Sequence, residues 1–423
     1  MGSAEWGARH DIPRNRIEHV TPAHGDVVII GAGVFGATAA LELRARGYGV
    51  TLVDRGPLPH EDASSTDISK MVRMDYGADI FYHELAEASL DGWDAWNRAW
   101  PHPLFHDEGF LVLSPAPMAP GSFEYDSFHT LRDRGYDPPR IDPATLRKRH
   151  PAWNGDRYPD GYFSTRGGWA ESGAVVGQLL GLCRGAGVSF RSGSFSELTE
   201  RGSRVSGVRL VDGAELPADH VVVAAGAWTP VLLPWLSDVL QPVAQPVVHF
   251  GVENPDDFRG PHFPPFAADT SGSGWYGFPA LADGRLKLGH HGDGRVVHPD
   301  DRGTVGADHF ERARAFLSES LPSLADAPVV GSRVCLYCDS FDGDLLIAQD
   351  PKHEGLIVAS GGSGHGFKFA PMIGALVADA LEGRENRWDQ RFRWREGGER
   401  RVEPARMKGS PGEQTSISGD EHR

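Results

Sequence analysis

Two apolar runs separated by a segment with helical spacing organise the N-terminal part of the chain. Residues 27–30 form the first run, and four consecutive apolar residues are typical of a buried strand. The second run, residues 49–53, is short and rich in β-formers, and it ends in Asp54. This order of strand, helix and strand predicts a βαβ unit.

Three glycines stand where the first strand meets the helix. Gly31, Gly33 and Gly36 have the spacing G-x-G-x-x-G, which permits a tight turn, close approach of a pyrophosphate and close packing of the helix on the strand. The pyrophosphate then meets the positive end of the helix dipole, and Asp54 is placed to accept hydrogen bonds from a ribose 2′-hydroxyl. The motif predicts a dinucleotide site without choosing between FAD and a nicotinamide dinucleotide. A glycine-rich turn that binds nothing is the alternative.

Two later segments have a similar pattern. Residues 221–226 are predicted to form a buried strand that ends in Ala225 and Gly226 and returns beneath the cofactor, although an unrelated core strand would read the same way. A glycine-rich segment with Gly364 and Gly366 lies between a predicted strand and a predicted helix. The N-terminus of that helix is a second place for negative charge, and a structural turn is the alternative.

The remaining pattern divides the chain into two kinds of structure. Helices are predicted at residues 83–100 and 371–381, and strands at 109–114 and 356–359. Between 240 and 330, short β-like segments and proline-rich turns indicate a separate α+β domain. The predicted fold class is therefore α/β plus α+β, a discontinuous Rossmann-type domain with a second, antiparallel-sheet substrate domain.

The predicted boundaries follow from this division. We expect the first domain to comprise residues 26–100, 151–235 and 331–390, and the second to comprise residues 101–150 and 236–330. Residues 1–25 are expected to be a flexible leader and residues 403–423 a disordered tail.

Composition narrows the choice of partners and compartment. Lys and Arg total 42 against 58 Asp and Glu, and the net charge of −16 argues against binding to a nucleic-acid backbone. No stretch approaches the roughly 20 apolar residues of a membrane span. Three cysteines are too few for a disulfide framework and favour a reducing compartment. We therefore expect a cytoplasmic protein.

Three cations stand in unusual surroundings. Lys70 and Arg73 belong to a predicted loop and are separated by two apolar residues, which is odd for a solvated face, although a surface turn with scattered cations is the alternative. Lys287 is flanked by Leu286 and Leu288 on a predicted strand. Alternation puts Lys287 on the face opposite the two leucines, toward a cavity or, as an edge lysine, toward solvent.

Histidine and cysteine pairs invite a metal site, and the sequence argues against one. His290 and His291 are adjacent, so they point to opposite faces of a strand, and no carboxylate or cysteine stands at ligand spacing. Cys335 and Cys338 form C-x-x-C without a second pair. Cys183 lies among leucines of a predicted helix and is expected in the core. We expect no metal.

Several short motifs, taken in order, resemble one family. They are GAGVFG followed by Asp54; STDISKMVRMDYG; VVVAAGAW; YGFP followed by LKLGHH; CLY; and SGHGFKFAP. Together they are similar to the amine-oxidase branch of the D-amino-acid-oxidase-like flavoproteins, specifically monomeric sarcosine oxidase and the fructosyl amino acid oxidases (amadoriases). The resemblance spans residues 26–400 and implies an FAD-binding domain and FAD as the cofactor.

The resemblance also implies roles for single residues. Cys335 would be attached covalently to the flavin, and Lys287 would activate oxygen. Arg73 and Lys368 would hold the carboxylate of the substrate. The remaining implied site residues are the catalytic or substrate-side Tyr276, His291 and Tyr337, the flavin-adjacent Lys70, and the cofactor-binding Gly31, Gly33, Gly36, Asp54, Ala225, Gly226, Gly364 and Gly366.

The implied reaction is oxidation of the C–N bond of an N-substituted α-amino acid, giving an imine that water hydrolyses, and hydrogen peroxide. Lys70 and the segment 391–398 look like fructosyl amino acid oxidases, whereas His291 looks like sarcosine oxidases. The N-substituent therefore stays open between methyl, fructosyl and a ring. A small-molecule substrate, molecular oxygen and a monomer or weak homo-oligomer are expected.

Two other functions stay open. One is a flavin dehydrogenase or tailoring oxidase of a cyclic or secondary-metabolite amino acid that uses another electron acceptor. The other is a non-catalytic flavin-sensing protein. The cations Lys70, Arg73, Lys287 and Lys368 speak against a sensor, because binding alone does not require so many desolvated charges around one cavity.

Overall fold

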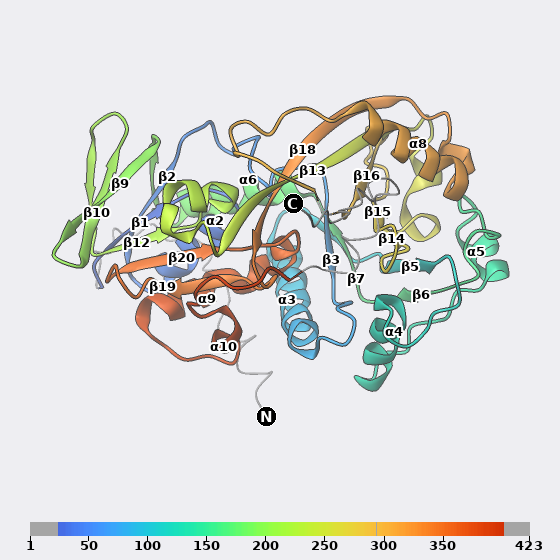
Figure 1. Cartoon of the computed structure of the whole chain (residues 1–423), viewed down its shortest axis with the longest axis horizontal. Coiled ribbons are helices and arrows are strands. Elements are labelled where there is room, and N and C mark those ends of the chain that lie inside the picture. Colours follow the sequence, from blue (N-terminus) through green and yellow to red (C-terminus); the bar gives the residue numbers. More distant parts are fainter. Residues whose placement is uncertain (1–23, 293, 402–423) are drawn as a thin grey trace, which may run out of the picture.

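A computed structural model describes residues 24–292 and 294–401 of the chain (Figure 1). Its first sheet has six strands, parallel except for the antiparallel edge pair β19–β20. In spatial order the strands are β19 (Leu346–Gln349), β20 (Leu356–Ser360), β12 (His220–Val223), β1 (Asp26–Ile30), β2 (Gly49–Asp54) and β8 (Ser189–Ser192). The predicted βαβ unit is confirmed, with α2 spanning Val34–Ala45.

The first strand shows why the sequence has a continuous apolar run there. Val27 and Ile29 belong to one buried cluster, whereas Val28 and Ile30 belong to another on the opposite face of the sheet. Because both faces are covered, no position in β1 after Asp26 can be polar. Helices α2, α6 (Ser172–Gly185) and α9 (Ala370–Glu382) supply residues to the first cluster. Cys183, on α6, is fully buried in it, as predicted.

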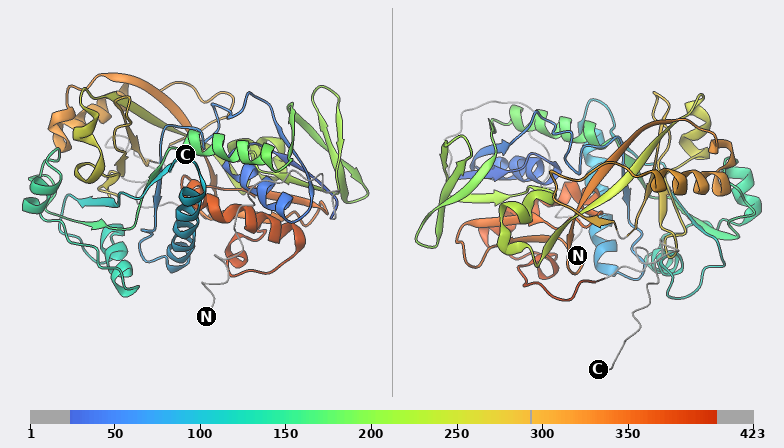
Figure 2. Two further views of the ribbon diagram at one scale, coloured as in Figure 1. Left: turned by 180° about the vertical axis from the view of Figure 1, so that it is seen from behind. Right: turned by 45° about the horizontal axis from the view of Figure 1, so that its top comes forward.

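The second sheet is mostly antiparallel and lies at the other end of the molecule (Figures 1 and 2). Its strands in spatial order are β17 (Arg295–Val296), β13 (Leu240–Gly251), β16 (Arg285–His290), β15 (Trp275–Gly277), β14 (Phe266–Ala268), β5 (Phe110–Ser114) and β6 (Asp160–Ser164), and β18 (Val329–Ser340) also pairs with β13. The long strands β13 and β18 run from this sheet toward the first, and Leu240 and Leu336 reach the first sheet's second cluster.

Two strands of the second sheet come from segments that were predicted to belong to the cofactor domain. Strand β6 and β18 hydrogen-bond within the second sheet, although residues 151–235 and 331–390 are expected in the cofactor domain. The division into domains stays a prediction. The predicted leader and tail lie almost wholly outside the described residues.

The remaining strands form two small sheets of three strands each. One contains β3 (Lys70–Arg73), β7 (Gly167–Ala170) and β4 (Phe105–His106), and the other β9 (Phe195–Arg201), β10 (Arg204–Leu210) and β11 (Glu215–Pro217). The placement of Lys70 and Arg73 in a loop is therefore wrong. These residues pair antiparallel with β7, whose Ala170 and Gly167 are their partners, and this distant pairing is invisible in the local sequence.

Helix α3 (Ile80–Ala99) lies between the two large sheets in every view (Figures 1 and 2). It begins three residues before the predicted start because the Asp79 side chain accepts a hydrogen bond from the Tyr82 amide at 3.2 Å. The other helices are α4 (Phe123–Asp133), α5 (Pro143–Arg149), α7 (Thr229–Leu232), α8 (Ala307–Ser320) and α10 (Asp389–Phe392). No helix in the described ranges is long and apolar enough to cross a membrane.

Candidate active site

Most of the predicted cofactor residues meet in one cavity of about 410 Å³ at the carboxyl ends of the parallel strands, and Cys335 is not part of its lining. Seven of the eight expected glycine, alanine and aspartate positions line it: Gly31, Gly33, Asp54, Ala225, Gly226, Gly364 and Gly366. The eighth, Gly36, lies behind the wall, where a Cβ atom would collide with the carbonyl oxygen of Gly31. Lys70 and Tyr337 also line the cavity, which therefore extends from the βαβ turn toward the second sheet.

The inner end of this region contains a buried ion pair. Lys287, on β16, is 1% exposed, and its Nζ contacts Oδ2 of Asp67 and donates to the carbonyl oxygen of Ser69 at 2.8 Å. The ammonium also lies 4.9 Å from the centroid of the Phe278 ring. Lys287 is thus a buried cation with fixed partners, and the edge-lysine alternative is wrong.

Asp67 is a residue that the sequence analysis missed. Burial alone would raise its pKa, but the Lys287 ammonium, His249 and Lys70 hold the pKa of this carboxyl well below its usual range. Burial and the neighbouring Lys287 ammonium lower the pKa of Lys70 to about 8. The one available signal was an isolated acid in the motif STDISK, close to a lysine in sequence.

Strand β3 separates two sides of the site. Lys70 and Arg73 are three residues apart, so their side chains leave opposite faces of the strand. Lys70 lines the cofactor cavity, while the Arg73 guanidinium carbon lies 5.3 Å from the centroids of Tyr76 and Phe123. Phe110 lies 5.6 Å away. Nη1 of Arg73 is buried and has no hydrogen-bond partner in the described part of the chain.

Lys368 lies beside the same aromatic ring as Arg73. Its Nζ donates to the Tyr76 hydroxyl at 3.0 Å and to the carbonyl oxygen of His365 at 3.1 Å, and it lies 5.2 Å from the Tyr76 centroid. The Lys368 carbonyl oxygen is held by Ser89 and Trp93 of α3, at 2.5 and 2.7 Å. Two cations far apart in sequence are thus brought to one tyrosine.

Three polar side chains from the second sheet form a group of their own. Nδ1 of His291 is 3.4 Å from the Tyr337 hydroxyl, and Tyr337 also interacts with the hydroxyl of Tyr276. Burial and Tyr337 raise the pKa of Tyr276 well above its usual value. Gly289 makes room for this arrangement, because a Cβ there would lie 2.5 Å from the Tyr276 hydroxyl. The structure thus brings together the three residues expected on the substrate side.

Comparison with known proteins assigns the chain to a family. Residues 26–380 match the family described as DAO, FAD dependent oxidoreductase. The chain belongs to this family. Monomeric sarcosine oxidase of Bacillus sp. is 28% identical over 371 residues, covering 85% of the chain and 93% of that protein. N-methyl-L-tryptophan oxidase of Salmonella arizonae is 30% identical over 367 residues, covering 84% and 95%.

Solved structures agree with this membership. Fructosyl peptide oxidase from E. terrenum has a TM-score of 0.79 with 25% identity, covering 95% of this chain and 99% of that one. Fructosyl amine:oxygen oxidoreductase (Amadoriase I) from Aspergillus fumigatus has a TM-score of 0.75 with 25% identity, covering 88% and 89%. The expected fold and family resemblance are confirmed.

The residues present fit the family's FAD. Helix α2 begins at the N-cap Gly33, and Gly33 and Val34 line the cavity, where the Val34 amide donates to Ser65 Oγ at 3.2 Å. Gly31 has φ +103°, and a Cβ atom there would lie 2.5 Å from the carbonyl oxygen of Ala224. The glycines therefore leave a cradle of the kind that a pyrophosphate fills, and Asp54 lies at its edge.

The two cysteines of C-x-x-C lie in different surroundings within this DAO-family site. Cys335 is buried, and its Sγ is 3.6 Å from Oδ2 of Asp67. Cys338 lines the cofactor cavity with its Sγ 3.3 Å from Ser360 Oγ, and burial raises its pKa to about 11. Cys338 is thus a neutral thiol, while Cys335 lies beside charged groups.

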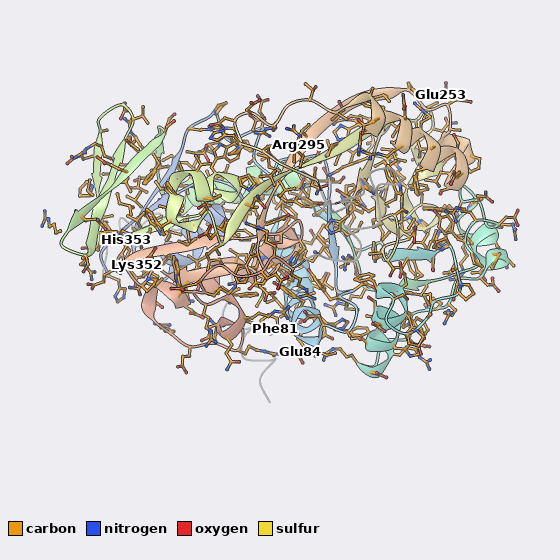
Figure 3. The ribbon with its side chains drawn as sticks, viewed as in Figure 1. Phe81, Glu84, Glu253, Arg295, Lys352 and His353 are labelled. Carbon is orange, nitrogen blue, oxygen red and sulfur yellow. The ribbon has the colours of Figure 1, made fainter. Side chains whose placement is uncertain are left out.

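Arg391, in the C-terminal segment, supports the site from outside. Arg391 pairs with Asp79 and Asp344, and its guanidinium lies 4.6 Å from the Tyr82 ring, which stacks on Tyr76 at 5.0 Å. Figure 3 labels Phe81, beside α10 at the start of α3, and Arg391 lies 5.1 Å from its ring. This segment therefore braces the aromatic side of the site.

Proposed function

We propose that the chain oxidises the C–N bond of an N-substituted α-amino acid, with FAD as the cofactor and molecular oxygen as the electron acceptor. The observation that carries the proposal is the guanidinium of Arg73, which lies between aromatic rings beside Lys368 and whose Nη1 is buried without a hydrogen-bond partner among the described residues. A buried cationic donor without a partner is costly unless a ligand supplies an anion. The α-carboxylate of an amino acid is such an anion.

Carboxylate binding would orient the substrate. Arg73 and Lys368 would form charge-assisted hydrogen bonds with the carboxylate, which are stronger than bonds between neutral groups. The aromatic walls at Tyr76, Phe110 and Phe123 exclude water from that end. Bound FAD supplies a two-electron acceptor for the C–N bond, and water hydrolyses the resulting imine. The protein's contribution is to hold the amine in one orientation.

The opposite side of β3 would serve oxygen. A buried ammonium at Lys287 is in place before oxygen arrives, so it would stabilise negative charge on oxygen without rearrangement. Asp67 and the Ser69 carbonyl fix its position. Tyr276, His291 and Tyr337 would line the substrate end of the second sheet.

Cys335 is the residue that we propose for covalent attachment of the flavin. Of the two cysteines on β18, Cys335 is the one beside the charged group of Lys70, Lys287 and Asp67, whereas burial raises the pKa of the Cys338 thiol to about 11. After acid precipitation, the wild-type protein should keep its yellow colour and the Cys335→Ser variant should lose it. Colour kept by C335S and lost by Cys338→Ser would reverse the assignment.

A substrate panel tests the reaction itself. Purified holoenzyme is mixed anaerobically with N-methyl, N-fructosyl and cyclic α-amino acids, each beside the matching amine without a carboxylate. Bleaching of the flavin by at least one carboxylate-bearing amine, and peroxide on admitting air, are the expected results. Equal bleaching by the decarboxylated partners would contradict the role of Arg73, and failure of every amine to bleach the flavin would favour a sensor.

A further inference from the structure

A second cavity of about 530 Å³ reaches the ion pair from the side away from the cofactor cavity. Asp67 and His249 line this groove, and neither lines the cofactor cavity in the described part of the chain. The groove is open to solvent. The charged side chains that line it together with His249 are Glu61, Asp62, Asp67, Glu171, Arg285 and Arg333.

Asp67 connects the groove to Lys287. One carboxylate oxygen, Oδ2, contacts the ammonium, while the other, Oδ1, lies 3.4 Å from Nε2 of His249. The backbone of Asp67 is fixed, because its carbonyl oxygen accepts hydrogen bonds from Ser172 Oγ at 2.5 Å and from the Gly173 amide at 2.9 Å. The carboxylate is therefore held as a bridge between the two bases.

His249 lies beside Lys287 for a structural reason. The two residues face each other across the antiparallel pair β13–β16, so their side chains leave the same face of the sheet. The His249 side chain is only 12% exposed, and its Nε2 is buried without a hydrogen-bond partner of good geometry among the described residues. A buried ring nitrogen that faces a carboxylate and borders a wet groove is placed to exchange protons.

We propose that His249 and Asp67 carry protons from this groove to Lys287 during peroxide formation. The inference rests on the proposed use of oxygen. Converting O2 to H2O2 takes two electrons and two protons, of which FAD, when bound and reduced by the substrate, would supply both electrons and one proton. Lys287 gives the second proton and becomes a neutral amine. His249 in its protonated form then passes a proton through Asp67 to that amine, and groove water restores the imidazolium.

The burial of Lys287 makes such a route necessary. At 1% exposure, its nitrogen cannot take a proton directly from bulk water. Asp67 is the acidic side chain that contacts Nζ in the described part of the chain, so the proton's path back to Lys287 leads through it. His249 is therefore a positioning and proton-passing residue that acts through Asp67, and it does not touch the reacting atoms.

Chemical rescue tests this role in the holoenzyme. In the His249→Ala variant, we expect reoxidation of the substrate-reduced flavin by oxygen to slow at least tenfold, while anaerobic reduction by the substrate keeps its rate. Added imidazole should enter the groove and restore the reoxidation rate, which should saturate with imidazole concentration. The rate restored by different methylimidazoles should follow the order of their solution pKa values. His249→Gln, which keeps the side-chain volume, should be slow and should not be rescued. The matched control is Arg285→Gln, in the same groove and on the strand of Lys287, which should match the wild type.

A second readout needs no turnover. In histidine-labelled holoenzyme, the NMR signal of His249 is the one that disappears in His249→Gln. This signal should move in Asp67→Asn, because the carboxylate that lies 3.4 Å from Nε2 is replaced by an amide. An unchanged signal would show that Asp67 does not act on the His249 ring and would overturn the relay.

The outcomes separate this inference from the proposed function. If Lys287→Met slows reoxidation but His249→Ala and His249→Gln do not, the relay is wrong and the oxygen role of Lys287 stands. If Lys287→Met also leaves reoxidation unchanged, the proposed oxygen side itself is wrong. A slow His249→Ala variant that imidazole does not rescue would indicate a structural role for His249 and overturn the relay.

Discussion

On one side of β3 the buried cation Lys287 has a carboxylate partner, whereas on the other side the half-buried cation Arg73 is surrounded by aromatic rings and, among the described residues, keeps an unpartnered buried donor atom. A buried charge or donor is costly without a partner. Lys287 has its partner within the protein, while the Nη1 donor of Arg73 is available to a ligand. The difference separates a paired charge, suited to a transient oxygen species, from a binding charge suited to a stable anion.

The largest expected effect comes from removing the paired charge of Lys287. Lys287→Met should slow reoxidation of the reduced flavin by oxygen about 100- to 1,000-fold, as the loss of a preorganised charge does at an oxyanion site. Anaerobic reduction by the substrate should stay within a few-fold of the wild type. Stopped-flow measurement of the two half-reactions checks this. Equal losses in both would show that the two sides of β3 are not functionally separate.

Removing the binding charge should act on the other half-reaction. Arg73→Gln is expected to lower kcat/KM for flavin reduction about 100-fold, since one buried charge-assisted interaction contributes roughly 3 kcal/mol. Reoxidation by oxygen should not change. Arg140→Gln, which changes an arginine that lies 5.1 Å from the Phe128 ring, is the control. A loss confined to reoxidation would reverse the assignment of the two sides.

The free energy of unfolding should show that Lys287 and Asp67 stabilise each other as a pair. Lys287→Met leaves the Asp67 carboxylate buried without its partner, and Asp67→Asn does the same to the ammonium, so each should cost about 3–5 kcal/mol of unfolding free energy. The double variant should recover much of that loss because no lone charge remains. Denaturant unfolding of the four proteins measures the coupling. If the losses of unfolding free energy in the two single variants add up in the double variant, the interaction between Lys287 and Asp67 contributes little to stability.

The smallest expected effect concerns pH. Because burial and Lys287 lower the pKa of Lys70 from 10.5 to about 8, its cation is present below that pH and lost above it. The reoxidation rate should therefore fall by a few-fold as pH rises through about 8. In Lys70→Arg the guanidinium stays charged, so this fall should vanish. Stopped-flow measurement of the reoxidation rate between pH 6 and 10 tests this prediction. If the wild type and Lys70→Arg show the same dependence of this rate on pH, Lys70 does not affect the reaction with oxygen.

Local patterns were sufficient for the cofactor half of the site. The glycines, the strand ends and Asp54 could be placed because a βαβ turn is built from neighbours in sequence, and all of them but Gly36 line one cavity. Lys70 and Arg73 could be suspected but not placed. Their strand exists only because β7, about 100 residues away, pairs with it.

The sequence by itself determined the fold class, the dinucleotide cradle and the family, because these depend on periodicity and on short motifs in order. The tertiary structure alone decided which charges are paired. Asp67 meets Lys287 across 220 residues, and His249 faces Lys287 only through the register of β13 and β16. Charge compensation depends on distances of a few ångströms between segments remote in the chain, and no local pattern encodes those distances.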